Sequence, residues 1–368
     1  GATSTQLITL LGYKRGGYIT AVITFFIWIL PASLIMALLS FVLTDYAELS
    51  GIMQLLHFIQ PMAIGFLLFA FYRSYLTSVK NTTHHTIMLF ATLFLFLFFR
   101  SPWIIPIIII LSGLVTYFVG EKHAKLGEIK KPSFKWGFLV SFLFLFLFVG
   151  ILSEISRKKD WRNRTALNLI ENNYRFGSFV FGGGDVLIPM MYEQYVTRPN
   201  TDRVKESKRD VLKINSAAFL TGSGIVRAIP GPIFSIASFT GALALKEKGI
   251  GGQIIGAVVA SIGVFLPSFL IVLFFFPIWQ KLKKYALFYR SLEGIYAAVV
   301  GIMLGATLYL LKDIVFDLGG LTGINIGVYL LVFCTTAIVL VRYKVAPQWV
   351  VLGTILLGAL LTLWPSIF

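Results

Sequence analysis

The stretch FGSFVFGGGDVLIPMMYEQYV, residues 176–196, is apolar but contains three consecutive glycines, and PGP follows it at residues 230–232. Each glycine costs about 1 kcal/mol relative to alanine inside a helix. A proline removes a backbone donor and disfavours helical geometry in the preceding residue. Interrupted apolar segments of this kind do not face lipid, because their freed backbone groups need protein or water as partners. The stretch therefore predicts broken or re-entrant helices inside a membrane protein.

The composition of the whole chain indicates the same class. Of the 368 residues, 57% are hydrophobic and 13% are charged, against about 25% charged in soluble proteins, and the mean hydropathy is +0.83. These values exclude a soluble enzyme and a nucleic-acid-binding module, and we expect an all-α polytopic membrane protein. The candidate membrane spans are Tyr18–Leu43, Ile52–Tyr75, Ile87–Phe99, Trp103–Val119, Trp136–Leu152, Gly252–Pro277, Ser291–Leu311, Thr322–Val341 and Pro347–Trp364.

The net charge of +16 is concentrated in short stretches between these spans. Cytoplasmic loops collect Lys and Arg, so we expect most of the excess to report orientation in the membrane. An anionic substrate is the competing interpretation of this charge. Three basic stretches follow one another, at 121–135, 153–175 and 198–213, and they cannot all be cytoplasmic if every intervening segment crosses once. Either one segment is re-entrant or the rule fails locally. The single cysteine, Cys334, excludes a disulfide or a cysteine-based metal site within one chain, and no cofactor is expected.

An internal repeat is the strongest long-range pattern. A shift of 236 residues places Gly16 on Gly252, Leu30-Pro31 on Leu266-Pro267 and Gly65 on Gly301. The loop Thr44–Gly51 is acidic, whereas its counterpart Gln280–Arg290 is basic. Opposite loop charges place the two loops on opposite sides of the membrane. The sequence therefore predicts two inverted-topology repeats, as in many secondary transporters.

The repeat divides the chain into three parts. We expect a first repeat over residues 1–120, a linker with one membrane helix and a basic loop over 121–175, and a second repeat over 176–368. Gly1-Ala2-Thr3 corresponds best to Gly231-Pro232-Ile233. The first repeat is therefore expected to lack its N-terminal part.

Two backbone breaks in the second repeat are candidate substrate sites. Consecutive glycines let an anion approach backbone N–H groups, and a half-helix that begins after the prolines presents free donors and a positive dipole end. Arg227 supplies a planar fork that suits an oxyanion, and an arginine in an apolar stretch usually faces the protein interior. The alternatives are helix packing for the glycines and snorkelling to an interface for the arginine. The candidate substrate-binding residues are Gly182, Gly183, Gly184, Arg227, Pro230, Gly231, Pro232 and Ser235, with Thr3, Ser4 and Gln6 from the first repeat.

Two acids lie near the glycine break. Asp185 follows the glycines directly, and Glu193 lies eight residues further on. Either carboxylate is a candidate carrier of a coupled proton. Equally, either could pair with Arg227 or Lys213, which would give it a structural role.

At these residues the sequence resembles the chromate ion transporter family. The resemblance rests on Phe181–Gly184, Pro230–Pro232 and Leu266–Ser268, and in the first repeat on Gly16-Gly17 and Leu30-Pro31. It covers most of residues 1–80 and 176–365. Where Arg227 and Asp185 stand, the chain departs from the residues common in that family.

The resemblance implies a protein that exports chromate from the bacterial cytoplasm, driven by the proton motive force. We expect a multi-pass protein of the bacterial inner membrane whose substrate is a small inorganic oxyanion, chromate or a sulfate-like dianion. The expected partners are this anion and the lipid bilayer, without nucleic acid, and a homodimer is a candidate assembly. An uncoupled anion channel and an intramembrane enzyme acting on lipids are the alternatives, although no catalytic constellation supports the enzyme.

Overall fold

The computed structural model describes residues 2–45, 55–101, 103–119, 136–180, 183–206, 211–282, 286–317 and 323–363. Within these ranges the regular structure is helical and contains no strand, which confirms the all-α prediction. The longer helices are α1 (Ala2–Asp45), α3 (Ile59–Ser78), α4 (Thr82–Phe98), α5 (Ile104–Val119), α6 (Trp136–Lys158), α7 (Arg164–Phe179), α12 (Gly249–Leu282), α13 (Ala286–Lys312), α14 (Gly323–Arg342) and α15 (Pro347–Leu363). The shorter ones are α8 (Leu187–Tyr192), α9 (Asp202–Glu206), α10 (Ser216–Ile225) and α11 (Ile236–Ala244).

The helices have the length and apolar surface of membrane spans. Four described helical segments are long and apolar enough to cross a bilayer: Ser4–Thr44, Trp136–Lys158, Lys246–Phe274 and Arg290–Val315. Shorter apolar helices, α4, α5, α14 and α15 among them, add to these. Large apolar side chains are exposed along the outer helices, as at Phe144 and Leu147 of α6. Such a surface is suited to lipid, so the prediction of a polytopic membrane protein is confirmed.

Helix α1 is two helical arms joined at a glycine pair. Gly17 has φ 72° and ψ −153°, so the second arm begins at Tyr18, where the sequence predicts the first span. The same backbone geometry recurs at Gly249, with φ 71° and ψ −170°, where the chain turns from α11 into α12. This region of φ and ψ is open almost only to glycine.

The two breaks predicted in the second half of the chain are present. Helix α7 ends at Phe179, and after the glycines a 3₁₀ turn at Gly184–Val186 leads into α8. Gly183 has φ 136°, a conformation that L side chains rarely adopt. Helix α10 ends at Ile225, and a second 3₁₀ turn at Ile233–Ser235 leads into α11. The prolines between these elements stop one helix and start the next.

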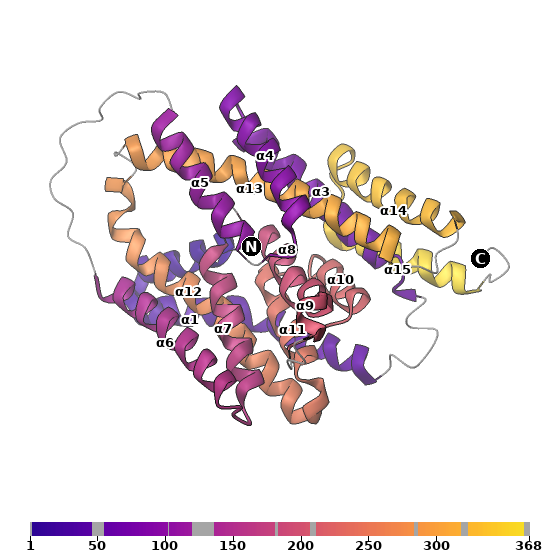
Figure 1. The fold of residues 1–368 in the computed structure, drawn as a ribbon, viewed down its shortest axis with the longest axis horizontal. Helices are drawn as coiled ribbons and strands as arrows, with labels where there is room; N and C mark the ends of the chain where they lie inside the picture. The colour runs from indigo at the N-terminus through magenta and orange to yellow at the C-terminus, as the bar shows by residue number, and fades with distance from the viewer. Residues whose placement is uncertain are drawn as a thin grey trace.

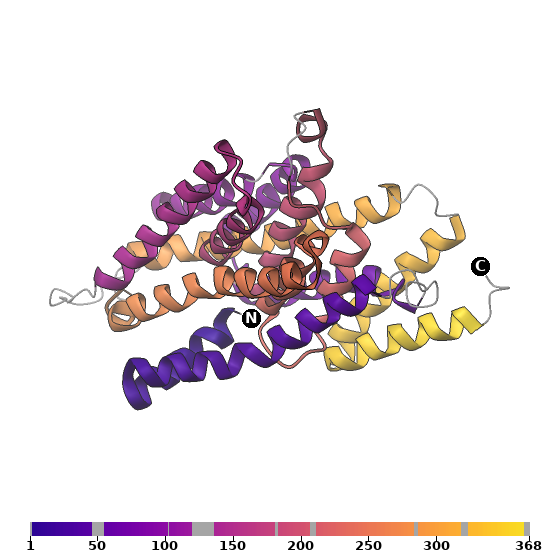
Figure 2. The ribbon, with the colours of Figure 1, turned by 90° about the horizontal axis from the view of Figure 1, so that it is seen from below.

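The helices form two connected groups. Figure 1 shows α13 running across the molecule, and α3, α4 and α5 pack against it. Helix α7 packs between α6 and α12, and α11 packs against both α12 and α1. In Figure 2, α1 runs along the lower edge of the molecule from its left end, and α14 and α15 lie at the right end.

Glycines allow close contacts between α13 and α4 and between α3 and α14. A Cβ atom placed on Gly301 of α13 would lie 2.3 Å from the carbonyl oxygen of Met88 of α4. A Cβ atom on Gly65 of α3 would lie 2.9 Å from the carbonyl oxygen of Phe333 of α14. Both distances are shorter than van der Waals contact, so larger residues would separate these helices.

Candidate functional site

The two backbone breaks are joined by an ion pair. Arg227 follows the last turn of α10, and its Nη2 atom lies 2.6 Å from Oδ1 of Asp185, in the 3₁₀ turn after the glycines. The side chain of Arg227 is only 8% exposed, and its guanidinium lies 5.3 Å from the centre of the Phe66 ring of α3. Of the two partners open to Asp185 in the sequence, Arg227 is the one that the structure gives it.

The pair leaves hydrogen-bonding capacity unused. Nε and Nη2 of Arg227 and Oδ1 of Asp185 are buried, and none of them makes a hydrogen bond. Nη2 and Oδ1 are close enough for Coulomb attraction but lie off the hydrogen-bonding direction. An acceptor with several lone pairs, such as an oxyanion, would satisfy the guanidinium donors.

The PGP break packs against α1. A Cβ atom on Gly231 would lie 2.5 Å from the Cβ atom of Ala32, next to Pro31 in α1. Ser235 is fully buried, and its hydroxyl donates to the carbonyl of Pro232 at 2.8 Å. In this conformation the Ser235 proton stabilises the turn and is not directed toward an anion.

Several sequence-predicted residues are described only in part. Gly182 lies outside the described residues, as do the loop 46–54 and the basic stretch 121–135, and the side chain of Thr3 is not described. Ser4 and Gln6 are half-buried on the first turns of α1. The N-terminus lies near the middle of the molecule in both ribbon views (Figures 1 and 2). A contribution of these residues to an anion site stays a prediction.

Glu193 lies in the helical extension of α8. It is 5% exposed, and its buried Oε1 atom makes no hydrogen bond. Beside it is a cavity of about 30 Å³ whose lining includes Arg175 and Gln194, which is about the volume of one water molecule. Its coupling role stays a prediction.

A much larger basic cavity adjoins this small one. Its volume is about 840 Å³, and five basic side chains and two carboxylates line it. They come from the end of α6, from one face of α7 and from residues 194–212. The charged and amide residues are Glu154, Arg157, Lys158, Arg164, Asn168, Glu171, Asn172, Arg175, Gln194 and Arg198.

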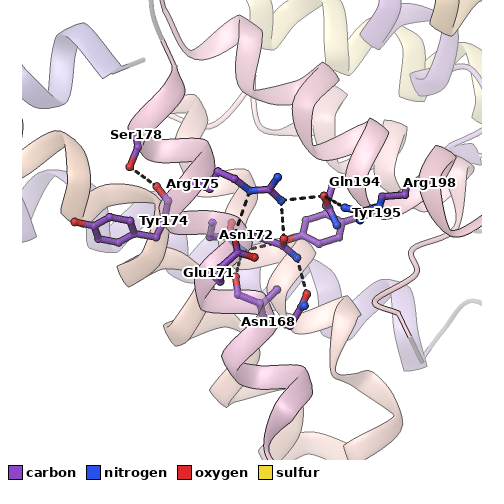
Figure 3. A network of polar contacts seen from close by, with 11 residues as sticks. Asn168, Glu171, Asn172, Tyr174, Arg175, Ser178, Gln194, Tyr195 and Arg198 are labelled. Atoms are coloured by element: carbon purple, nitrogen blue, oxygen red, sulfur yellow. Dashed lines mark hydrogen bonds and ion pairs between the residues drawn. The ribbon is translucent and has the colours of Figure 1, made fainter. Parts of the chain in front are cut away.

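Two arginines meet on one amide in this basic cavity (Figure 3). Arg175 Nη2 donates to Gln194 Oε1 at 3.0 Å, and Arg198 Nη1 donates to the same oxygen at 3.0 Å. Arg175 Nη2 also donates to Asn172 Oδ1 at 2.9 Å, and its Nε lies 3.3 Å from Glu171 Oε1. Two guanidinium groups are thereby held close together with one carboxylate beside them.

The basic cavity was not predicted from the sequence, because most of its charges lie in stretches that are also explained by orientation in the membrane. A signal was present, since Asn168, Glu171, Asn172 and Arg175 recur at the spacing of one helical face. A polar face on a helix that packs between α6 and α12 indicates a buried polar site. The sequence does not show that Gln194 and Arg198 lie beside this face of α7, because their position depends on how the chain turns at the break between α7 and α8.

The basic cavity also bears on the orientation of the chain. Residues from the basic stretches 153–175 and 198–213 line the same cavity, so the two stretches lie close together in space. The chain between them, α7 to α8, enters the protein and returns. The structure therefore favours the re-entrant alternative for this pair of stretches.

Comparisons with known proteins agree with this architecture. The family model described as chromate transporter matches residues 1–117 and 167–359. The chain is 26% identical to an uncharacterized transporter of Methanocaldococcus jannaschii over 84% of this chain and 71% of the relative. It is 22% identical to the chromate transport protein of Cupriavidus metallidurans, over 97% of this chain and 79% of the relative.

A third relative has a similar name. The chain is 23% identical to the probable chromate transport protein of Synechococcus elongatus, over 86% of this chain and 73% of the relative. No solved structure matches. The family and these relatives are transporters, not enzymes. The match of the family model to most of the chain, on a helical membrane architecture, shows that this protein belongs to the chromate transporter family.

Proposed function

We propose that this protein is a secondary active transporter that exports chromate, or a sulfate-like dianion, at the expense of the proton motive force. The observation that carries the proposal is Arg227, which is buried between two backbone breaks with two guanidinium nitrogens unused in hydrogen bonding. An arginine at membrane depth is costly and marks a functional site by default. Its planar fork matches two oxygens of a tetrahedral oxyanion. The names of the relatives support chromate as the anion.

The anion would lie between two inverted repeats, the first over residues 1–120 and the second over 176–368. Reciprocal contacts support this arrangement. Gly65 lies against Phe333, and Gly301 lies against Met88. The two glycines are 236 residues apart in the sequence, and their two partners are 245 residues apart. In each contact the glycine comes from one half of the chain and its partner from the other half. A two-fold relation between the halves requires each half to offer the same contact to the other.

A second pair of contacts has the same two separations in the sequence, because Gly113 and Gly358 are 245 residues apart and Leu55 and Ser291 are 236 apart. A Cβ atom on Gly113 of α5 would lie 3.6 Å from the carbonyl oxygen of Ser291, and one on Gly358 of α15 would lie 2.2 Å from that of Leu55. The breaks at Gly17 and Gly249 share one backbone geometry, although they are 232 residues apart, and they add to this support. Rocking of one repeat against the other would give alternating access.

Coupling to protons would use a carboxyl whose ionisation depends on the anion. Asp185 is the first candidate, because its carboxylate is paired with Arg227, the proposed anion ligand. Glu193, buried without a hydrogen bond at Oε1, is the second candidate. The bacterial inner membrane is the proposed location, and a homodimer is the proposed assembly.

Transport in proteoliposomes tests the proposal. Purified protein should move radiolabelled chromate or sulfate against its gradient when a proton gradient is imposed, and Arg227→Gln should abolish this flux. The control is Lys246→Gln, which removes an exposed charge and should transport normally. Equal transport by Arg227→Gln would remove the proposed role of the arginine. Flux that ignores the proton gradient would favour a channel, and transport of a different class of solute would overturn the substrate.

A further inference from the structure

We propose that the basic cavity between α6, α7 and residues 194–212 is a second anion-binding site, distinct from Arg227, which takes a tetrahedral dianion on Arg175 and Arg198. Anion binding at this site does not depend on the proposed function. Only its role as the vestibule from which the transported anion enters the protein rests on that proposal.

The arrangement of the two arginines carries the inference. Arg175 and Arg198 both donate to one oxygen of Gln194, which holds two positive groups on the same wall of the cavity. Two carboxylates, Glu171 and Glu193, interact with these arginines. Five bases and only two acids line the cavity as a whole, and this excess of positive charge favours an anion. Arg175 keeps its Nε free of hydrogen bonds, since Glu171 contacts it only off-axis at 3.3 Å.

Glu171 acts as an internal competitor in this site. Its carboxylate is the anion that Arg175 contacts, at 3.3 Å from Nε. Arg198 is the second charge that acts on it. The other charged groups that line the same cavity are Arg157, Lys158, Arg164 and Glu154. A dianion offers more charge and more acceptors than one carboxylate, so it would displace Glu171 from Arg175.

The size of the basic cavity suits this role. A volume of about 840 Å³ holds a small dianion together with many waters, each of which takes about 30 Å³. The anion would bind while still partly hydrated, which lowers the desolvation cost of leaving water. Capture in a hydrated vestibule would precede complete desolvation at the buried Arg227.

Isothermal titration calorimetry with sulfate tests the site. The Arg227→Gln background removes the other proposed anion site, and nanodiscs of neutral phosphatidylcholine exclude anionic lipid headgroups. In this background we expect one sulfate bound per chain. Adding Arg175→Gln or Arg198→Gln should weaken that binding about tenfold or more, which corresponds to the loss of one charge-assisted hydrogen bond.

Two further variants separate a specific site from a diffuse charge effect. Glu171→Gln should bind sulfate more tightly, which a misfolded protein would not do. Lys246→Gln removes the same charge from an exposed side chain outside the lining of the cavity, and it should change the dissociation constant by less than about threefold. Unchanged binding in Arg175→Gln and Arg198→Gln, or an equal loss in Lys246→Gln, would overturn the second site. The proposed function is judged separately, by transport in the Arg227→Gln single variant.

Discussion

Arg227 Nη2 lies 2.6 Å from Asp185 Oδ1, and this contact joins the end of α10 to the turn after the glycine break. The two breaks are separate in the sequence, yet they share one buried charge pair. A cation that neutralises an internal carboxylate and still has unused donors can exchange that carboxylate for a substrate anion. The pair therefore serves both the stability of the breaks and the proposed binding of an oxyanion.

The pair should show strong energetic coupling. Asp185→Asn or Arg227→Gln leaves one buried charge without its partner, which is more destabilising than removing both charges. We expect the double variant to be more stable than the two single effects predict, with an interaction energy of about 1–3 kcal/mol. Thermal unfolding in detergent of the four proteins of the cycle measures this energy. Simple additivity would show that the 2.6 Å contact has no energetic role.

A side chain at Gly183 should destabilise the protein, although no atom lies within 4 Å of the position that its Cβ atom would take. Its φ of 136° is strained for any L residue, so Gly183→Ala should cost about 1–3 kcal/mol. The matched control is Gly353→Ala in α15, which also has open space around it but lies in helical backbone. There alanine should be neutral or stabilising. Equal melting temperatures for the two variants would argue against backbone strain at the break.

Gly301 should be sensitive for a different reason. Its backbone is helical, but a Cβ atom would lie 2.3 Å from the carbonyl oxygen of Met88. Gly301→Ala should therefore force α13 and α4 apart and lower the melting temperature, with a cost of about 1–3 kcal/mol. Gly327→Ala in α14, where nothing lies within 4 Å, is the control. The contact is unimportant if the two variants melt together.

The stability contribution of Glu171 should depend on pH. Burial raises the pKa of the Glu171 carboxyl above its ordinary value of 4.5, while Arg175 and Arg198 act in the opposite direction. The folded protein then holds this proton more tightly than the unfolded chain does. The contribution of Glu171 to the free energy of unfolding is therefore fully present below pH 4.5. It is lost as the pH rises through the raised pKa.

Glu171→Gln removes this titration. The difference in melting temperature, variant minus wild type, should therefore grow as pH is raised from about 4.5 toward neutrality. Differential scanning fluorimetry at several pH values in one detergent measures it. A difference that shrinks with pH would show that the pKa of Glu171 is lowered and that its attraction to the arginines exceeds the cost of burial.

The sequence predicted the membrane class and the positions of the helices well, because both depend on local composition. The predicted spans coincide with the long helices to within a few residues at most ends. The breaks at the glycines and at PGP were also predicted. They follow from the conformational limits of glycine and proline, which hold in any fold.

Prediction from the sequence was weaker for the roles of polar residues. Ser235 was a candidate substrate-binding residue, and its hydroxyl donates to the carbonyl of Pro232 in the turn, so its contact with an anion stays a prediction. Asp185 had two possible partners in the sequence, and only the approach of α10 to the glycine break selected Arg227. A hydrogen bond depends on angstrom-scale geometry, which sequence spacing does not encode across a break.

The sequence by itself determined a polytopic helical protein with two interrupted apolar segments, because hydrophobicity and backbone freedom are properties of individual residues. Tertiary structure alone decided that Arg175 and Arg198 converge on Gln194 and that two basic stretches line one cavity. The physical reason is that charge acts through distance in space. Residues that read as separate loop charges become a binding surface only when the chain turns back at the glycines.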